Sequence, residues 1–308
     1  MTPAVTRPAT GRSLLGRQYF LAAGDHAATI VEVGAGLQRY ARGGHEVTVP
    51  FGDDVLPPKG CGATLVPWPN RIAGGRYEFA GAQQQLALTE PDEGNAIHGL
   101  GRWERWEKVR HVEDELTLRL DIVPQKGYPW PLRAEIDYRL DAETGLHVTL
   151  RARNTGSTAV PFGAGSHPYL ATHGHSLETV TVQVPARTAL VNDDHGIPTG
   201  TRALTGPDDL RRGRRLGERR FDEGFTELTV RDGRGAAEVR TRSGGARLWF
   251  DETFRYLQVF TIDSLAGGPP GVAVEPMTCA PNAFNSGEGL LVLEPGKTWT
   301  GGWGITPL

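Results

Sequence analysis

The sequence predicts an all-β protein, and three features carry this prediction. Alternation of apolar and polar residues with a period of two is common along the chain. The 3.6-residue periodicity of amphipathic helices is rare. Glycine and proline, with 41 and 22 residues of 308, are spread throughout and separate many short apolar runs. Short alternating runs divided by turn-forming residues are typical of β-sandwiches and β-barrels.

Individual strands can be placed by their alternation. In residues 115–123, the apolar positions Leu116, Leu118, Leu120 and Ile122 share one face, which is expected in the core. Residues 193–217 are expected to form a long polar connection with a short helical turn. Further strands are expected at residues 132–140, 146–153, 179–184, 227–231, 238–242 and 256–262.

The bulk composition limits the class of protein. Residues 1–12 are expected to be disordered and residues 13–308 to form one domain, since β-sandwiches can reach about 250 residues as a single unit. A net charge of -3 argues against a nucleic-acid or membrane partner, and a monomer or homodimer is expected. Cys61 and Cys279 fit no metal-site pattern, although one disulfide stays possible. The N-terminus has no signal-peptide pattern, so a cytoplasmic location is expected.

Two basic residues stand in glycine- and proline-rich segments, where all-β proteins often carry functional loops. Arg71 lies in PWPNRIAGGRY, between two prolines and two glycines. Its guanidinium donors suit sugar hydroxyls or a carboxylate, and the alternative is a structural arginine that donates to loop carbonyls. His98, in NAIHG, can donate to a ligand oxygen or be an ordinary core histidine.

Two further segments suit proton transfer. His167 lies in GAGSHPYL, where small residues would let a ligand approach the backbone and Pro168 restricts the preceding residue. Glu275 ends the apolar run VAVE, where burial would raise its pKa toward that of a general base. The alternative is a carboxylate that accepts hydrogen bonds from the following loop. His173 and His175 follow His167, but their spacing lacks a carboxylate, so no metal site is expected.

Taken in order, the segments NRIAGGRY, NAIHG, GSHPYL, FDEGF and VEPMTCAPNAFN resemble the aldose 1-epimerase (galactose mutarotase) family. The resemblance runs from about residue 30 to the C-terminus, and residues 291–305 look like the closing hairpin of that family. It implies a large antiparallel β-supersandwich with an open sugar-binding face. The loop after Glu275 is less acidic than the galactose-specific pattern, which resembles a less characterised branch. Trp130, in GYPW, offers an aromatic ring that could stack on a sugar.

The resemblance implies a role for each matched residue. His167 is implied as the acid that protonates the ring oxygen. Glu275 is implied as the base that deprotonates the anomeric hydroxyl. The residues implied to bind sugar hydroxyls are Arg71, His98 and Asp222, with Asn70 of the same NR motif beside them.

These roles predict an aldose 1-epimerase that interconverts the α and β anomers of a free aldohexose without a metal or other cofactor. The active form needs His167 protonated and Glu275 ionised, which predicts a bell-shaped pH profile. A hexose 6-phosphate epimerase stays open, with the arginines of residues 211–215 as its cationic cluster unless they form a solvated loop. So do a non-catalytic carbohydrate-binding protein and a glycoside-processing enzyme that uses Asp222 and Glu275 as a carboxylate pair.

Overall fold

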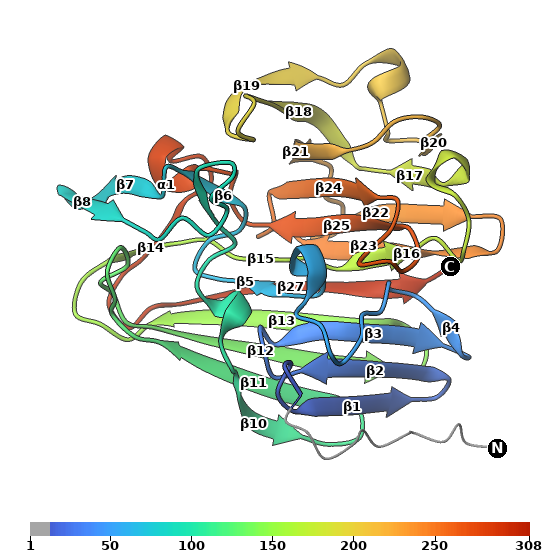
Figure 1. Ribbon diagram of the computed structural model, residues 1–308, viewed down its shortest axis with the longest axis horizontal. Coiled ribbons are helices and arrows are strands. Elements are labelled where there is room, and N and C mark those ends of the chain that lie inside the picture. The colour runs from blue at the N-terminus through green and yellow to red at the C-terminus, as the bar shows by residue number, and fades with distance from the viewer. Residues whose placement is uncertain (1–12) are drawn as a thin grey trace.

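The computed structural model describes residues 13–308, so the prediction for residues 1–12 lies outside the described part of the chain. Within this part, the fold is built from antiparallel strands (Figure 1), and the one α-helix, α1 (Ala283–Ser286), spans four residues. The 3-10 turns are η1 (Pro58–Gly60), η2 (Gly101–Trp103), η3 (Leu177–Thr179) and η4 (Gly206–Asp208). None of the described helices has the length and apolar character needed to cross a membrane. The prediction of an all-β antiparallel fold is confirmed.

The largest sheet has nine strands. In spatial order they are β10 (Glu107–His111), β11 (Glu115–Ile122), β12 (Leu132–Asp141), β13 (Gly145–Asn154), β27 (Thr298–Pro307), β23 (Gly244–Asp251), β22 (Arg234–Thr241), β17 (Thr181–Gln183) and β20 (Arg214–Arg215). In β11 every second residue is buried, beginning with Leu116, as the alternation predicts. The other face carries exposed ion pairs such as Arg133 with Asp121, at 2.7 Å. One face of the sheet therefore packs and the other stays in solvent.

A second sheet has eight strands and carries the glutamate singled out above. Its main path runs β19 (Pro198–Ala203), β18 (Ala186–Asn192), β21 (Asp222–Leu228), β24 (Tyr256–Ile262), β25 (Gly271–Met277), β15 (Gly165–Ser166) and β5 (Thr64–Leu65), and β16 (Tyr169–Ala171) also pairs with β25. All seven residues of β25 are buried, Glu275 among them. Glu275 lies directly opposite Gln258 of β24. A carboxylate is thus placed inside a central strand, where water reaches it poorly.

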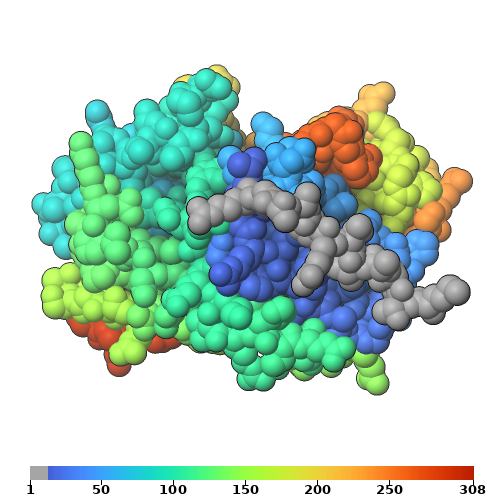
Figure 2. Space-filling view, turned by 60° about the horizontal axis from the view of Figure 1, so that its bottom comes forward, coloured from blue at the N-terminus to red at the C-terminus, as the bar shows by residue number. Residues whose placement is uncertain are grey.

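A four-stranded sheet near the N-terminus completes the larger layers. It contains β1 (Gln18–Ala23), β2 (His26–Val31), β3 (Gly36–Arg42) and β4 (His45–Glu46). Its blue surface lies beside the green segment of β10 and β11 (Figure 2), where the ring of His111 contacts the carbonyl of Phe20 at 3.0 Å. Buried side chains from all three larger sheets meet in one hydrophobic cluster. This shared core supports the loops that hold the functional side chains.

Three two-stranded sheets accompany the three larger sheets. They are β6 (Arg71–Ala73) with β9 (Asn95–Ile97), β7 (Arg76–Phe79) with β8 (Ala82–Gln85), and β14 (Val160–Phe162) with β26 (Leu291–Leu293). The pairing of β6 with β9 places Arg71 opposite Ile97, one residue before His98. Two motifs that lie 27 residues apart are thereby joined.

The structure departs from the sequence predictions in three places. The strand predicted at 227–231 is wrong in its bounds. β21 runs from Asp222 to Leu228, and the chain then turns into β22 through the Arg231–Arg234 bridge. The polar connection 193–217 does contain a helical turn, η4, but also the strands β19 and β20. The prediction that residues 291–305 form a closing hairpin is wrong as well. The two strands in this segment do not pair with each other, because β26 pairs with β14 whereas β27 pairs with β13 and β23.

Candidate active site

A cavity of about 380 Å³ lies beside β24 and β25, within the range of about 300–1,000 Å³ usual for small-molecule sites. Its lining comes from the loops around β6 and β9, from the turns η1 and η2, and from strands of the eight-stranded sheet. Most of the residues singled out from the sequence meet here: Asn70, Arg71, His98, His167, Asp222 and Glu275. Segments separated by up to two hundred residues therefore converge on one pocket.

The floor of the cavity holds a histidine and a glutamate in direct contact. The Nε2 atom of His167 lies 3.3 Å from Oε1 of Glu275, and both side chains are buried. Among residues 13–308, neither Nδ1 of His167 nor Oε2 of Glu275 has a hydrogen-bond partner. The alternative role of Glu275, as an acceptor for backbone amides of the next loop, finds no such bond in the described chain. Its second oxygen, Oε2, is buried and has no hydrogen-bond partner among the described residues.

Burial shifts both groups toward their neutral forms. Desolvation, followed by the negative charge of Asp222, raises the pKa of Glu275 well above its usual value. Desolvation also lowers the pKa of His167 to about 3, assisted by the positive charge of Arg102. When the pair holds one proton, these shifts favour its position on Glu275 over its position on His167.

The backbone around His167 holds its ring in place. Its amide donates to the carbonyl of Ala63 at 3.1 Å, and its carbonyl accepts from Gly62 at 2.8 Å. The ring of Tyr169 stacks on the imidazole with a centroid separation of 5.1 Å. A Cβ added at Gly60 would stand 3.1 Å from Cδ2 of His167, which is a tight contact, and the φ of 74° at Gly60 also favours glycine.

The small residues before His167 serve packing instead of ligand approach, contrary to the sequence prediction. A Cβ at Gly165 would lie 2.9 Å from Cβ of Pro69, and a Cβ at Gly163 would lie 2.5 Å from Sγ of Cys279. Neither glycine lines the cavity. They let protein segments approach one another behind the site. Cys279 and Cys61 are both buried and free.

His98 is a neutral donor aimed into the same cavity. The backbone amide of Asn70 donates to its Nδ1 at 3.2 Å, so a neutral ring carries its proton on Nε2. Burial lowers the pKa of His98 well below its usual value, and the charges of His167 and Arg102 add to this effect. Its ring meets that of His167 edge to face, 5.3 Å between centroids. The Nε2–H group is thus available to a ligand oxygen.

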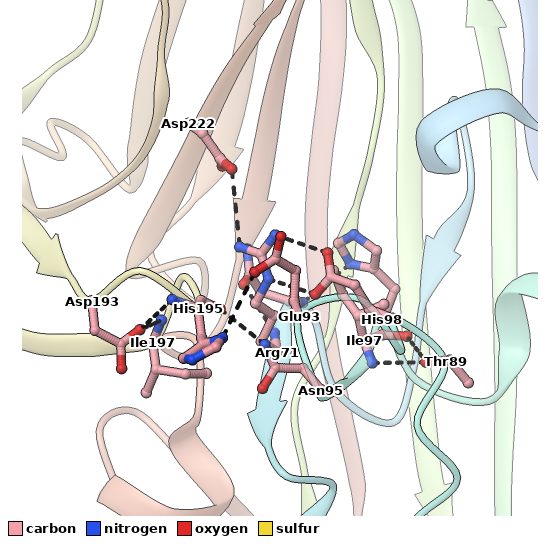
Figure 3. Close-up of polar contacts among 12 residues, drawn as sticks. Arg71, Thr89, Glu93, Asn95, Ile97, His98, Asp193, His195, Ile197 and Asp222 are labelled. Atoms are coloured by element: carbon pink, nitrogen blue, oxygen red, sulfur yellow. Dashed lines mark hydrogen bonds and ion pairs between the residues drawn. The ribbon is translucent and has the colours of Figure 1, made fainter.

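Charged side chains surround the mouth of the cavity (Figure 3). Arg71 forms a fork with Glu90, with Nε–Oε2 and Nη2–Oε1 distances of 2.7 and 2.9 Å. Its remaining Nη1 lies 4.0 Å from Oδ2 of Asp222, which reaches down from β21. Gln258 donates to Oδ1 of Asp222 at 2.6 Å. A guanidinium and a carboxylate presented side by side suit the donor and acceptor faces of adjacent sugar hydroxyls.

The aromatic predicted from the sequence is misplaced. Trp130 does not line the cavity but packs edge to face against Phe79 and Tyr128 in the core. The tryptophan at the cavity is Trp103, which is 45% exposed. It belongs to the turn η2, whose sequence GRW carries no motif that would have marked it.

Other lining residues also escaped sequence reasoning. Glu90 and Gln258 hold Arg71 and Asp222 in position, yet Glu90 is one of several acidic residues in a polar loop and Gln258 is one residue of an ordinary strand. Lys59 and Arg102 bring positive charge into the cavity from η1 and η2. Only their three-dimensional neighbours distinguish them from other polar residues.

The cavity floor also offers metal-ligand atoms. One nitrogen from each of His98 and His167 and one oxygen from Glu275 lie within 4.8 Å of one another. Two histidines and a glutamate form a donor set found in catalytic zinc sites. The same three groups suit proton transfer by themselves, and a chelator test separates the two uses.

Comparison with known proteins places these residues in a family. Residues 17–306 match the family model described as aldose 1-epimerase. The chain is 36% identical to the uncharacterised protein YihR of Escherichia coli K12 over 289 residues, which cover 92% of this chain and 90% of YihR. It is 29% identical to the aldose 1-epimerase of the same organism over 153 residues, or 47% of this chain and 43% of that enzyme.

Solved structures show the same fold. The structure of the GalM/aldose epimerase homologue from C. elegans superimposes with a TM-score of 0.83 at 18% identity, covering 95% of this chain and 98% of that one. The galactose 1-epimerase from Lactobacillus acidophilus gives a TM-score of 0.78 at 20% identity, covering 93% and 92% of the two chains. The match extends over nearly the whole of each chain.

Proposed function

The chain belongs to the aldose 1-epimerase family, and on this premise we propose that it interconverts the α and β anomers of an aldohexose. The observation that carries the proposal is the contact of 3.3 Å between His167 and Glu275 at the floor of the cavity. An acid and a base this close can serve two oxygens attached to the same carbon. In a pyranose, the ring oxygen and the anomeric hydroxyl are such a pair.

Ring opening needs two proton transfers. Oε2 of Glu275 removes the proton from the anomeric oxygen, and His167 donates a proton to the ring oxygen as its bond to C1 breaks. The product is the open-chain aldehyde, and rotation about the C1–C2 bond turns the other face of the carbonyl toward the hydroxyl. The two groups then exchange roles, and the ring closes as the other anomer. The protons are returned, so no net change occurs in the protein.

The surrounding residues hold the sugar for these transfers. The Nε2–H of His98 donates to a sugar oxygen near His167. Arg71 and Asp222 bind hydroxyls at the mouth of the cavity, where Glu90 and Gln258 fix their orientations. Holding the substrate in one orientation lowers the entropy cost of reaching the transition state.

Burial of the pair favours the opening step. Before opening, the pair must carry an imidazolium and a carboxylate, which are costly in a desolvated site. After opening, Glu275 is protonated and His167 is neutral, which is the ionisation that burial favours. The free energy released by this neutralisation offsets part of the cost of breaking the C1–oxygen bond.

The pKa order of the pair determines the pH profile. Below the lower pKa both groups are protonated and no base is present, whereas above the higher pKa neither is protonated and no acid is present. Because the lower pKa is that of His167 and the higher is that of Glu275, activity should extend across neutral pH. With ordinary values of about 6.5 for histidine and 4.3 for glutamate, kcat/KM would be confined between those limits. Measurement of kcat/KM from pH 4 to 9 distinguishes the two profiles.

The activity itself is tested by anomeric exchange. Freshly dissolved α-glucose and α-galactose should relax faster with the protein than in buffer alone, as followed by polarimetry. Glu275→Gln should lower kcat/KM by about 10²–10⁴-fold, because a positioned acid or base contributes about this much. Glu294→Gln, at an exposed carboxylate of the C-terminal turn, is the matched control and should leave the rate unchanged. Equal rates for wild type and Glu275→Gln would contradict the proposal.

Three further measurements distinguish the proposed metal-free epimerase from other functions. Dialysis against a chelator should leave exchange unchanged if the histidines and Glu275 act without a metal ion, and loss restored by zinc would assign them as ligands. Sugar binding without faster exchange would favour a carbohydrate-binding protein. Release of reducing ends from an oligosaccharide would favour glycoside hydrolysis by Asp222 and Glu275.

A further inference from the structure

Arg102 carries a charge that no carboxylate of the described chain contacts, and the charge of Glu90 offsets only part of the effect of burial, which lowers the pKa of Arg102. It lies in η2, lines the cavity and is 9% exposed. Within residues 13–308, its Nε has no hydrogen-bond partner, and no carboxylate oxygen approaches its guanidinium within 4 Å. A guanidinium stays protonated at every physiological pH, and burying a charge without a partner is costly. The partner of Arg102 is therefore expected from outside the chain.

Arg71 provides the contrast within the same cavity. Its guanidinium is also mostly buried, but Glu90 engages it through two nitrogens and Asp222 faces a third. Its charge is already balanced, so it can bind neutral hydroxyls. Arg102 has no equivalent of Glu90 in contact.

A second cation and an aromatic ring stand with Arg102. Lys59, in η1, lines the cavity and is exposed. The guanidinium carbon of Arg102 lies 5.0 Å from the centroid of the Trp103 ring, a cation–π contact that helps to fix its direction. The two turns thus present two positive side chains to the same cavity.

Both turns adjoin the His167 side of the floor. The amides of Leu100 and Gly101 at the start of η2 donate to the carbonyl of Val66, next to β5, and β5 pairs with β15 immediately before His167. Gly60, next to Lys59 in the chain, packs against the His167 ring. The positive charge of Arg102 lowers the pKa of His167, whereas that of Arg71 acts on Glu275. In the proposed reaction His167 serves the ring oxygen, and the ring carbon beyond that oxygen, C5, carries the exocyclic carbon C6.

We propose that Arg102 and Lys59 bind an oxyanion on C6, so that the preferred substrate is an anionic aldose. This inference rests on the proposed epimerase function. The anionic group is a carboxylate, a phosphate or a sulfonate, each of which offers oxygens to the guanidinium fork. Its negative charge would also offset the effect of Arg102 on His167 and help the imidazole to hold the proton that it donates.

The arginines of residues 211–215 do not provide this site. Arg214 and Arg215 line a separate surface hollow together with Pro207 and Arg219, and neither lines the cavity that holds Glu275. Arg211 pairs with Asp209 at 2.6 Å. The cationic cluster that is visible in the sequence is therefore not the one at the substrate.

The test compares neutral and anionic sugars in one assay. Exchange between the α and β anomers is measured from their anomeric-proton signals by ¹H NMR, with the rate in buffer subtracted. The sugars are glucose, glucose 6-phosphate, glucuronate and glucose with a sulfonate in place of the C6 hydroxyl. Wild-type kcat/KM should be at least about tenfold higher for one anionic sugar than for glucose, as expected for a charge-assisted contact. The anionic sugar with the highest kcat/KM identifies the group as phosphate, carboxylate or sulfonate.

Variants identify which side chains cause the preference for an anionic sugar. Arg102→Met should reduce the anionic-to-neutral ratio of kcat/KM by about 10- to 100-fold, and Arg102→Lys should reduce it less because the charge remains. Lys59→Met, at an exposed position where folding is not at risk, should lower the same ratio. Arg215→Met, in the separate hollow, is the matched control and should leave it unchanged.

The outcomes separate this inference from the proposed function. Equal wild-type values for glucose and all three anionic sugars, or a ratio that neither Arg102→Met nor Lys59→Met changes, overturns the anion site and leaves the epimerase intact. Exchange of no sugar above the buffer rate overturns the proposed function, and the anion site in substrate turnover falls with it.

Discussion

The floor and the rim of the cavity both hold titratable and charged side chains, but these side chains differ in how they are partnered. At the floor, His167 and Glu275 are buried, their side chains make a polar contact with one another, and among the described residues one polar atom of each has no partner. At the rim, Arg71 is paired with Glu90, and Asp222 accepts from Gln258. Burial without partners shifts pKa values, because a charge loses its hydration and receives nothing in return. Pairing keeps charges in place, and such groups recognise a ligand instead of exchanging protons with it.

The largest expected effect comes from breaking the floor. Glu275→Gln and His167→Asn should each lower kcat/KM by about 10³-fold, within the range of a positioned acid or base. Because both groups act in the same step, the double variant should be no slower than the slower single variant, within a few-fold. Anomeric exchange followed by NMR gives the rates. Multiplicative losses in the double variant would mean that the two residues act independently.

A smaller effect is expected from the rim. Glu90→Gln removes the partner that orients Arg71, so KM should rise by about tenfold while kcat changes less, since substrate positioning and not proton transfer is affected. Arg133→Met, which breaks an exposed ion pair on the nine-stranded sheet, is the control and should change neither constant. A fall in kcat with unchanged KM would instead place Arg71 and Glu90 in the chemical step.

The smallest effect concerns stability. The pKa of Glu275 is higher in the folded than in the unfolded chain, so wild type loses stability as the pH rises above about 4.3. Glu275→Gln has no such group and should be more stable at pH 8 by about 1–3 kcal/mol. The difference should vanish near pH 4, as measured by denaturant unfolding at both pH values. Glu294→Gln, which changes an exposed carboxylate on a turn, is the control and should show no pH-dependent difference from wild type. If Glu275→Gln were less stable than wild type at pH 8, the raised pKa of Glu275 in the folded chain would be contradicted.

The strands of the nine-stranded sheet were accessible to sequence reasoning because their signal is local. Residues 115–123, 132–140 and 146–153 alternate without interruption, and they form β11, β12 and β13. The strand at 227–231 was misplaced because β21 begins in FDEGF, whose glycine and acidic residues are typical of a turn. Its extended form depends on pairing with β18 and β24, which no local pattern records.

By itself, the sequence determined the all-β class, the family and the residues Arg71, His98, His167, Asp222 and Glu275 that the fold brings together. These follow from alternation and from short motifs that keep their order along the chain. Only the tertiary structure decided which tryptophan meets the cavity, which carboxylate holds Arg71, and which cation is left unpaired. It also decided the pKa order of His167 and Glu275. Charge balance and desolvation depend on neighbours that are distant in the chain, and such neighbours leave no mark in the local sequence.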